Sequence, residues 1–380
     1  MPDTPVDAQE RTEDAPAVKA RPKAKTPKNK AQARADKGKN SAQGMLSAVK
    51  RTGRKSSGKP SVFDAVGEEA KSSRGLFGGL TPKLMLELAA PHTWSASIMP
   101  VFLAMCLTAA DDGMLSSLMV VILLFISILM QSAVNTFNDY QDFVKGADTK
   151  ENQDDPTDAV LVYNDVEPYG VRNLAVVFVV LAFLLGIYVI VQVGWTPLII
   201  ALIGVACLYL YSGGPKPLSY LPVGEIVSGV VMGGLITLAS YMALSGEFSL
   251  IILVKSLPLI IGIGLIMFTN NTCDIEKDRK VGRATLSVSL GRKDSIVVYK
   301  ALILAWILLI VLNVVIFYPT GSLGLLFLVA AYPPLMGLFR NPFIPATRQA
   351  GMSAITTANV CLGLAYGAAI MLSGIVIVGV

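Results

Sequence analysis

Two stretches of the sequence concentrate carboxylate, carboxamide and basic side chains at regular spacing. The first, "NTFNDYQDFVKGAD", covers residues 135–148, and the second, "NNTCDIEKDRKVGR", covers residues 270–283. Both begin with the spacing Asn-x-x-x-Asp. Residues four apart lie on the same face of an α-helix. Each stretch, here called the first and the second motif, therefore presents a polar face built from amides and acids.

The acids of both motifs need a counter-charge. Asp139, Asp142 and Asp148 belong to the first motif, and Asp274 and Asp278 belong to the second. Two carboxylates a few ångström apart repel by about 4 kcal/mol at an effective dielectric constant of about 20. The chain has one histidine and no Cys-x-x-Cys pair. Oxygen ligands suit Mg²⁺, which takes one or two carboxylates and substrate phosphates, so the five aspartates are predicted Mg²⁺ ligands.

The amides and bases beside these acids fit a diphosphate. Carboxamides can orient metal ligands or contact diphosphate oxygens, and basic side chains can neutralise phosphate charge. The motifs therefore predict a site in which a metal ion holds a diphosphate. The candidate catalytic residues are Asp139, Asp142, Asp274, Asp278 and Asn138, and the candidate diphosphate-binding residues are Asn135, Asn270, Asn271, Lys145, Lys216, Lys277, Arg279 and Arg283.

The elements that must carry these motifs are membrane helices. The chain is 53% hydrophobic and 16% charged, whereas soluble domains are about 25% charged. Apolar stretches long enough to cross a bilayer, at about 20 residues each, must be helical because every backbone amide needs a partner inside lipid. The sequence predicts an all-α integral membrane protein of about nine spans, at residues 84–109, 115–137, 173–193, 196–212, 223–245, 250–271, 295–317, 322–338 and 356–378.

The basic residues of the loops predict how these spans are oriented. Lys and Arg occur in alternate loops, and such loops stay on the cytoplasmic side. The N-terminus is then cytoplasmic and the C-terminus outside, and both motifs end helices that run inward. We therefore expect the motifs to face a central cavity that opens to the cytoplasmic side of the membrane. Lys255 departs from this pattern, because it is a basic residue near the outer end of the sixth span. We expect its side chain to extend to the membrane interface.

The N-terminal part of the chain differs from the rest. Residues 1–80 hold 17 Lys+Arg and 9 Asp+Glu, whereas residues 81–380 hold 15 and 18. A segment with so few large apolar residues cannot offset its chain entropy. We predict a disordered basic cytoplasmic tail over 1–80 and a polytopic domain over 81–380. The tail is expected to touch anionic lipid headgroups and not nucleic acid, since no aromatics interleave its basic residues.

Several segments give the chain a resemblance to a known family. "NDYQDFVKGADT" (138–149), "YSGGPKPLSYLPVGE" (211–225) and "NN…DIEKD…GRATLSV" in the second motif resemble the UbiA superfamily of intramembrane prenyltransferases. Within it they are most similar to the 1,4-dihydroxy-2-naphthoate prenyltransferase branch of menaquinone synthesis. The resemblance implies a UbiA-like helical bundle. It also implies Mg²⁺-dependent transfer of a polyprenyl group from an allylic diphosphate to a small aromatic acceptor, 1,4-dihydroxy-2-naphthoate, with decarboxylation to demethylmenaquinone.

The same resemblance leaves the acceptor open. Alternatives in the superfamily are 4-hydroxybenzoate, homogentisate, chlorophyllide, haem, and a sugar or glyceryl phosphate. Candidate acceptor residues are His92, Tyr211 and Glu225, against the alternatives of an interfacial histidine, an interfacial aromatic and a helix-start acid. A cation transporter is the alternative from another class, but its carboxylates are expected at mid-membrane. Oligomeric state and prenyl chain length stay open.

Overall fold

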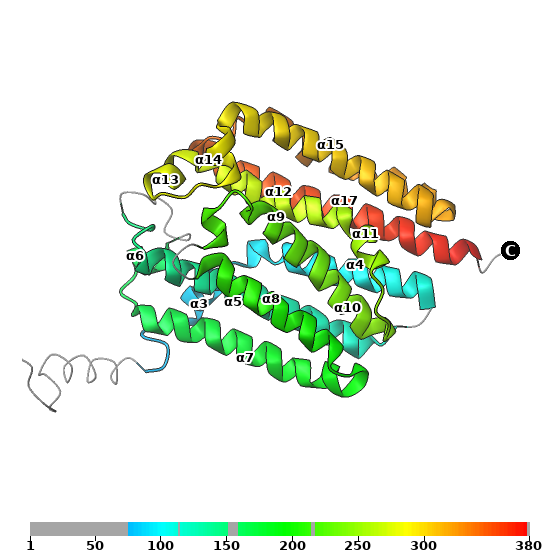
Figure 1. Cartoon of the computed structure of the whole chain (residues 1–380), viewed down its shortest axis with the longest axis horizontal. Helices are drawn as coiled ribbons and strands as arrows, with labels where there is room; N and C mark the ends of the chain where they lie inside the picture. The colour runs from blue at the N-terminus through cyan, green and yellow to red at the C-terminus, as the bar shows by residue number, and fades with distance from the viewer. Residues whose placement is uncertain (1–74, 113–114, 151–158, 214–216, 378–380) are drawn as a thin grey trace, which may run out of the picture. The chain divides into compact units, whose positions relative to one another are not determined.

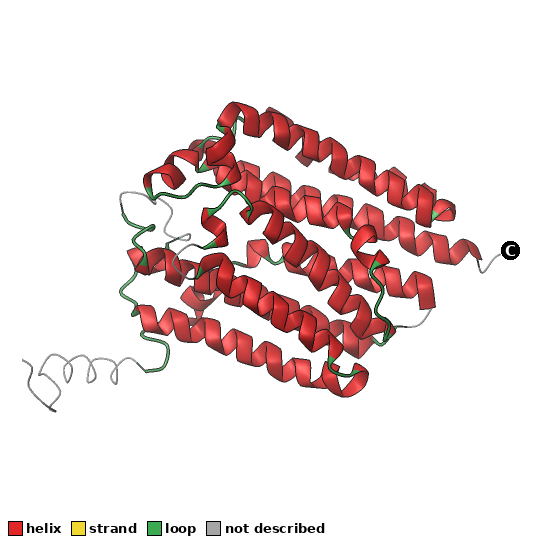
Figure 2. Ribbon diagram, in the orientation of Figure 1, coloured by secondary structure: helices red, strands yellow, loops and turns green. Residues whose placement is uncertain are grey.

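The computed structural model describes residues 75–112, 115–150, 159–213 and 217–377. All of them belong to the compact unit Glu68–Val380. Regular structure in these residues is helical throughout, with no strand among them (Figure 2). Most of the predicted tail, residues 1–74, and the candidate Lys216 lie outside the described residues.

Long apolar helices dominate the fold. Six helical stretches of the described chain are long and apolar enough to cross a membrane. A pair of helices joined at a bend would be a seventh if the pair is counted as one span. Two further apolar helices, α8 (Thr196–Ser212) and α12 (Leu257–Cys273), are shorter. The six stretches are α5 (Ser117–Val144), α7 (Pro168–Val193), α9–η3–α10 (Gly224–Ser228, Gly229–Leu235, Ile236–Ser245), α15 (Arg292–Phe317), η4–α16 (Pro319–Ala331, Tyr332–Arg340) and η5–α17 (Pro345–Thr347, Arg348–Ile377).

The remaining helices are shorter and connect or extend these stretches. Their bounds are α3 (Pro82–Ala89), η1 (Pro91–Thr93), α4 (Ser95–Asp112), α6 (Val160–Tyr163), α8 (Thr196–Ser212), η2 (Leu218–Tyr220), α11 (Ile251–Lys255), α12 (Leu257–Cys273), α13 (Ile275–Lys280) and α14 (Leu286–Leu290). Every predicted span coincides with one or more of these helices. The total of nine remains a prediction, because only part of the set meets the length criterion.

The first predicted span, 84–109, is broken rather than continuous. Ala90, between α3 and η1, has the left-handed backbone angle φ 48°, and the stretch Pro82–Thr93 meets Ser95–Asp111 of α4 at 54°. Pro91 explains the position of the break, because proline disfavours helical geometry in the residue before it. The Trp94 indole N–H donates to the carbonyl of Ala89, a buried residue, at 3.0 Å. The break places His92 in the short 3₁₀ helix η1, between α3 and α4, instead of inside one continuous helix.

The second motif also contains a helix break. We expected one continuous helical face, but α12 ends at Cys273 and α13 begins at Ile275, with Asp274 at φ −101° and ψ 17° between them. The Asp278 N–H still donates to the Asp274 carbonyl at 2.9 Å. Asp274 and Asp278 therefore stay one turn apart although the helix axis changes.

The helices run side by side and gather the motifs at one end of the bundle (Figure 1). In Figure 1 the short helices α6, α13 and α14 lie at this end, here called the motif end, and α11 and the C-terminal end of α17 lie toward the opposite end. Helix α17 packs on η4, α4 and α12, while α5 packs on α7. Gly233 permits the close packing of η3 on α12, since a Cβ there would lie 2.7 Å from the Ile260 Cα.

Residues 75–80, which the sequence placed in the tail, pack against the start of α7. The Glu167 N–H donates to the Gly78 carbonyl at 2.9 Å, and the Asn173 side chain donates to the Leu76 carbonyl at 2.9 Å. Leu80 is buried beside Val171 in a small apolar cluster.

Lys255 does not extend to an interface as expected. Its side chain is buried, and its Nζ lies 3.7 Å from Asp111 Oδ2 and 5.1 Å from the centre of the Tyr318 ring. The Tyr241 hydroxyl donates to the same Asp111 carboxylate at 3.1 Å. The side chain stays buried because it has local partners. A carboxylate and aromatic ring faces can take the place of the water molecules that would otherwise solvate a lysine ammonium group.

Candidate active site

One cavity of about 710 Å³ reaches from the motif end deep into the bundle. Its deep wall is apolar and comes from α5, α7, α8, η3 and α10. On α5 alone the lining runs from Leu123 to Asp142, roughly 28 Å at 1.5 Å per residue. Both motifs form its polar end through Asn135, Asn138, Asp139, Asp142, Asp148, Asn270, Asn271, Asp274, Lys277, Asp278 and Arg283.

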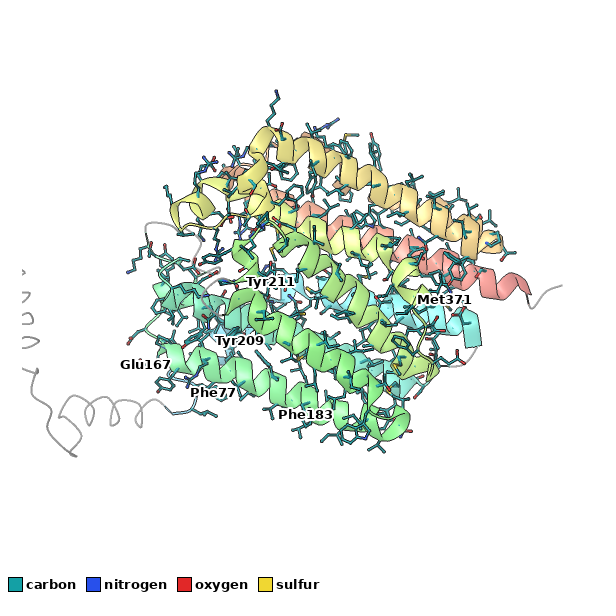
Figure 3. The ribbon with its side chains drawn as sticks, viewed as in Figure 1. Phe77, Glu167, Phe183, Tyr209, Tyr211 and Met371 are labelled. Carbon is teal, nitrogen blue, oxygen red and sulfur yellow. The ribbon has the colours of Figure 1, made fainter. Side chains whose placement is uncertain are left out.

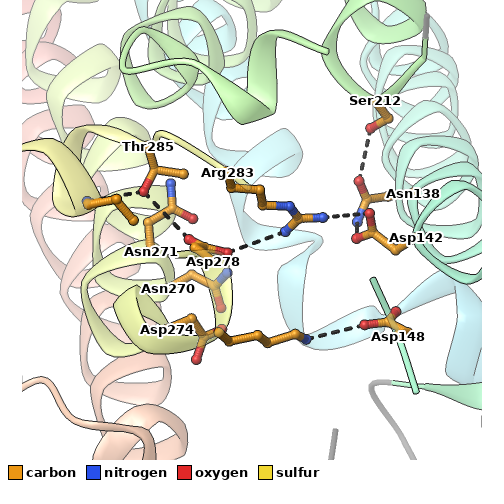
Figure 4. A network of polar contacts seen from close by, with 12 residues as sticks. Asn138, Asp142, Asp148, Ser212, Asn270, Asn271, Asp274, Asp278, Arg283 and Thr285 are labelled. Carbon is orange, nitrogen blue, oxygen red and sulfur yellow. Dashed lines mark hydrogen bonds and ion pairs between the residues drawn. The ribbon is translucent and has the colours of Figure 1, made fainter. Parts of the chain in front are cut away.

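Arg283 joins the two motifs across this cavity (Figure 4). Its Nη2 donates to Asp142 Oδ1 of the first motif at 2.5 Å, and its Nη1 lies 3.6 Å from Asp278 Oδ1 of the second motif. The guanidinium also lies over the Tyr220 ring, 4.8 Å from its centre. One cation is therefore held between two buried carboxylates and an aromatic face.

Two further ion pairs connect the acids at the cavity mouth. Lys277 Nζ donates to Asp148 Oδ1 at 3.2 Å, which again links the second motif to the first. Arg348, at the start of α17, lies with its Nε 3.2 Å from Asp274 Oδ2. Asp142, Asp148, Asp274 and Asp278 thus each have a basic partner in the structure.

Asn138 positions Asp142. Its Nδ2 donates to Asp142 Oδ2 at 3.2 Å, while its Oδ1 accepts from the Ser212 hydroxyl at 2.9 Å. Lys145 does not line the cavity; its Nζ donates to the Ser212 carbonyl at 2.6 Å. The end of α5 is therefore fixed to the end of α8, and the predicted orienting role suits the place of Asn138.

Asn135 lines the cavity but is engaged with the broken first span. Its Nδ2 donates to the Ala89 carbonyl at 3.1 Å and to the Thr93 hydroxyl at 2.8 Å. Its Oδ1 accepts from Gln131 at 3.1 Å. Asn135 thus holds the turn that carries His92, which is exposed and also lines the cavity.

Asn271 lies on the cavity wall and forms a buried pair with Glu225, which lies behind the wall and does not line the cavity itself. Asn271 Nδ2 donates to Glu225 Oε1 at 2.8 Å, and Glu225 is 4% exposed. Glu225 Oε2 is buried with no hydrogen-bond partner. Tyr211 lines the cavity and in Figure 3 lies near the middle of the bundle, closer to the motif end than to the opposite end. A buried oxygen without a hydrogen-bond partner is rare in folded proteins, so Glu225 Oε2 is a candidate for a functional contact.

Burial governs the charges at the motif end. It raises the pKa of Asp278 to about 6, against the attraction of Arg283. It also raises the pKa of Asp148, which Lys277 opposes. Burial alone would lower the pKa of Arg283, but the Asp142 carboxylate holds it above its ordinary value, so Arg283 stays charged. A cation near these acids is therefore strongly favoured.

The donor set fits a hard divalent cation. The acids and amides on the cavity wall offer only oxygen ligands at the motif end. In the described residues no three His, Cys, Asp or Glu side chains converge as a ready metal-binding group, because basic side chains stand between the acids. Mg²⁺ suits such a site, since it uses one or two carboxylates and completes its shell with substrate phosphate and water.

Some predicted residues lie elsewhere, and some contributors were missed. Arg279 is exposed and is not part of the cavity wall. Arg348, Tyr220 and Ser212 contact motif residues without having been predicted as site residues. Arg348 follows the second motif by more than 60 residues, and no regular spacing connects the two. The one sequence feature that pointed to it was its position in a loop predicted on the same side of the membrane as the motifs.

Comparisons with known proteins identify the family of the chain. The model of the UbiA prenyltransferase family matches residues 97–354. A 1,4-dihydroxy-2-naphthoate octaprenyltransferase of Bacillus subtilis (strain 168) is 35% identical over 219 residues, which are 58% of this chain and 70% of that protein. Human UbiA prenyltransferase domain-containing protein 1 is 30% identical over 220 residues, 56% of this chain and 62% of that protein.

A solved structure shares the fold. A UbiA homologue from Archaeoglobus fulgidus, bound to DMAPP and Mg²⁺, superposes with a TM-score of 0.54 over 76% of this chain and 98% of that chain, at 15% identity. The family match covers more than half of the chain, and the apolar helices are those of an integral membrane protein. This chain belongs to the UbiA prenyltransferase family and is a membrane-integral prenyltransferase.

Proposed function

We propose that this enzyme transfers a polyprenyl group from an allylic diphosphate to 1,4-dihydroxy-2-naphthoate in a Mg²⁺-dependent reaction. The observation that carries the proposal is the shared cavity, with both acidic motifs at one end and an apolar wall behind them. The acceptor rests on the 35% identity to the Bacillus subtilis octaprenyltransferase. The metal rests on the oxygen donor set and on the Archaeoglobus fulgidus homologue bound to DMAPP and Mg²⁺.

Mg²⁺ takes one or two carboxylates, which Asp139, Asp142, Asp274 and Asp278 would supply, and Asp148 is a further candidate ligand. Bound Mg²⁺ would supply positive charge that stabilises the leaving diphosphate. Lys277 and Arg283 line the same wall and are proposed to donate to the diphosphate oxygens. Asn138 keeps Asp142 in place through the contact described above, and Asn270 and Asn271 complete the polar wall. Lys145, Lys216 and Arg279 remain candidates for steering the anionic substrate toward the site.

The apolar part of the cavity is proposed to receive the prenyl chain and to exclude water. Ionisation of the C–O bond leaves an allylic cation, which water would quench. The wall opposite the motifs is built from residues such as Val189 and Ile200, both buried. A hydrocarbon chain therefore replaces few polar contacts on entry.

His92, Tyr211 and Glu225 are proposed to contact the aromatic acceptor. The unpartnered Oε2 of Glu225 can accept a hydrogen bond from an acceptor hydroxyl while Asn271 holds the other oxygen. The electron-rich ring then attacks the allylic cation at the carboxylated carbon. Loss of CO₂ supplies the electron pair that restores aromaticity, and the immediate product is demethylmenaquinol, the two-electron-reduced form of demethylmenaquinone.

We propose that the motif end faces the cytoplasm of a bacterial cell, with the N-terminus on the same side and the C-terminus outside. The support is the concentration of Lys and Arg in the loops at that end. The basic residues before residue 75 are proposed to touch anionic headgroups as a tail, and the catalytic domain is proposed to include residues 75–80, which pack against α7.

A prenyl-transfer assay tests the proposed function. Purified full-length protein is given radiolabelled prenyl diphosphate, Mg²⁺ and each of several aromatic acceptors in turn. We expect a labelled product with 1,4-dihydroxy-2-naphthoate, lost on addition of EDTA and restored by Mg²⁺. Product with 4-hydroxybenzoate or homogentisate alone would refute the acceptor, and undiminished transfer in EDTA would refute the metal dependence.

A further inference from the structure

Arg348 brings a third element of the fold to the diphosphate end of the cavity. It is the first residue of α17 and lies on the cavity wall. Its Nε donates to Asn270 Oδ1 at 2.9 Å and lies 3.2 Å from Asp274 Oδ2. Its side chain is 26% exposed. A guanidinium from the last helix is therefore seated on the two residues that define the spacing of the second motif.

The loop that carries Arg348 is firmly built. Asn341 Oδ1 accepts from the Phe343 N–H at 2.7 Å and from the Thr347 hydroxyl at 2.8 Å. Asn341 Nδ2 donates in return to the Thr347 carbonyl at 3.3 Å. These bonds close the turn between α16 and α17 and fix the residue that immediately precedes Arg348.

Arg292 ties this loop to the second motif. Its Nε donates to the Phe343 carbonyl at 2.7 Å. Its Nη2 lies 3.3 Å from the carbonyl oxygens of both Thr272 and Cys273, the last two residues of α12. Because Cys273 directly precedes Asp274, one side chain sets the loop and the acid relative to each other. Arg348 is thus held at Asp274 by the surrounding structure and does not depend on their mutual attraction alone.

The chemistry of a guanidinium suits two partners at this place. Its planar set of N–H donors binds a carboxylate and a phosphate in the same way. Asp274 is a proposed metal ligand, and a carboxylate that ligates a metal gives up part of its bond to an arginine. The diphosphate held by that metal offers Arg348 replacement oxygens within the same part of the cavity.

We propose that Arg348 is a third diphosphate-binding cation, beside Lys277 and Arg283, and that it exchanges its hold on Asp274 for the diphosphate when metal and substrate bind. The inference rests on the proposed function, because it takes Asp274 as a metal ligand. It goes further by giving the start of α17 a role in substrate binding.

Binding measurements on the full-length protein test this role without turnover. Titration calorimetry with Mg²⁺ alone, and with inorganic pyrophosphate at saturating Mg²⁺, compares the wild type with Arg348→Gln. Losing a charge-assisted hydrogen bond should weaken pyrophosphate binding by about tenfold or more. Mg²⁺ alone should bind the variant as tightly as the wild type or more tightly, because Asp274 has lost a competing cation. Arg348→Lys, which keeps the charge but not the planar donors, should fall between.

Arg340→Gln is the matched control, because Arg340 ends α16, is exposed and lies off the cavity wall. It should leave both affinities unchanged. Unchanged pyrophosphate affinity in Arg348→Gln would overturn the proposal. So would a parallel loss of Mg²⁺ and pyrophosphate binding together with a lower melting temperature, since that pattern indicates a structural role. A wild type that binds pyrophosphate but makes no naphthoate product leaves Arg348 supported and removes only the acceptor.

Discussion

Arg283 forms a hydrogen-bonded ion pair with Asp142, which lies 141 residues earlier in the chain. Asp142 lies in the last turn of α5, which carries most of the first motif, and Arg283 follows α13 of the second. The same guanidinium lies 3.6 Å from Asp278. The two motifs are thus held face to face by the chain's own charges, and their shared cavity is a consequence of that arrangement.

Removing this cation should destabilise the fold and the site together. Arg283→Gln leaves Asp142 and Asp278 buried, at 9% and 2% exposure, without their common partner. Loss of one member of a buried pair costs about 3–5 kcal/mol. We expect a lower melting temperature in detergent and a loss of prenyl transfer, measured by thermal unfolding and by the labelled-product assay.

Arg279→Gln provides the comparison, since Arg279 lies in the same motif but is exposed and off the cavity wall. It should change the free energy of unfolding by less than about 0.5 kcal/mol, so the melting temperature should stay close to that of the wild type. Equal melting temperatures for the Arg279 and Arg283 variants would contradict the bridging role.

Much of the fold and of the site could be predicted from sequence because its signals are local. Apolar length marks the helices, and Asn-x-x-x-Asp spacing marks the motifs. The structure places both Asp139 and Asp274 on one cavity wall, as the loop charges led us to expect. Asn138 orients Asp142 through a hydrogen bond between residues four apart in the sequence. Helical spacing is informative over this separation.

What escaped prediction depends on tertiary contacts. Arg348 reaches Asn270 from 78 residues away, and no spacing rule connects the two. Lys255 found Asp111 as a partner, which a hydropathy profile cannot show. The break at Ala90 could have been read from Pro91, but the apolar run around it concealed the signal. The break at Asp274 carries no proline or glycine and became visible only in the structure.

The pair formed by Lys255 and Asp111 gives a stability prediction at the other end of the bundle. Lys255→Met leaves Asp111 with Tyr241 as its partner but without a cation. Because Asp111 keeps part of its exposure, the loss should be smaller than for a fully buried pair, about 1–3 kcal/mol.

The double variant Lys255→Met with Asp111→Leu should recover most of this loss, since an apolar pair often replaces a buried ion pair at little cost. Thermal unfolding in detergent measures both variants. A double variant no more stable than Lys255→Met would contradict the account of this pair. Prenyl-transfer activity per folded molecule should be unchanged, because neither residue lines the cavity.

The depth of the cavity predicts a dependence on prenyl chain length. Gly186 lies on the cavity wall, and a Cβ there would have no atom within 4 Å. Gly186→Phe should therefore fold and add bulk beside the proposed path of the chain. We expect kcat/KM for a long prenyl diphosphate to fall about tenfold or more relative to a five-carbon one.

Gly337→Ala serves as its control, because the added methyl makes only an ordinary 3.8 Å contact and lies off the cavity wall. Its selectivity between the two chain lengths should match the wild type. A Gly186→Phe variant with unaltered selectivity would show that the chain takes a different route.

Glu225 provides a prediction about the acceptor. Glu225→Gln keeps the size of the side chain and a possible bond to Asn271, but it weakens the acceptor oxygen that lacks a partner. We expect KM for the naphthoate to rise, or kcat to fall, by about tenfold or more. The affinity for pyrophosphate with Mg²⁺ should change little. A variant that loses pyrophosphate binding and keeps its KM for the naphthoate would assign Glu225 to the diphosphate site instead.

The most direct test asks whether the two motifs act on one diphosphate. Pyrophosphate binding at saturating Mg²⁺ is measured for Asp139→Asn, Asp274→Asn and the double variant, with the exposed Asp294→Asn as control. We predict that each single variant loses most of the binding and that the double variant loses little more, because residues acting on one ligand are strongly non-additive. Free-energy losses that simply add, or a single variant that binds pyrophosphate like the wild type, would contradict a shared site.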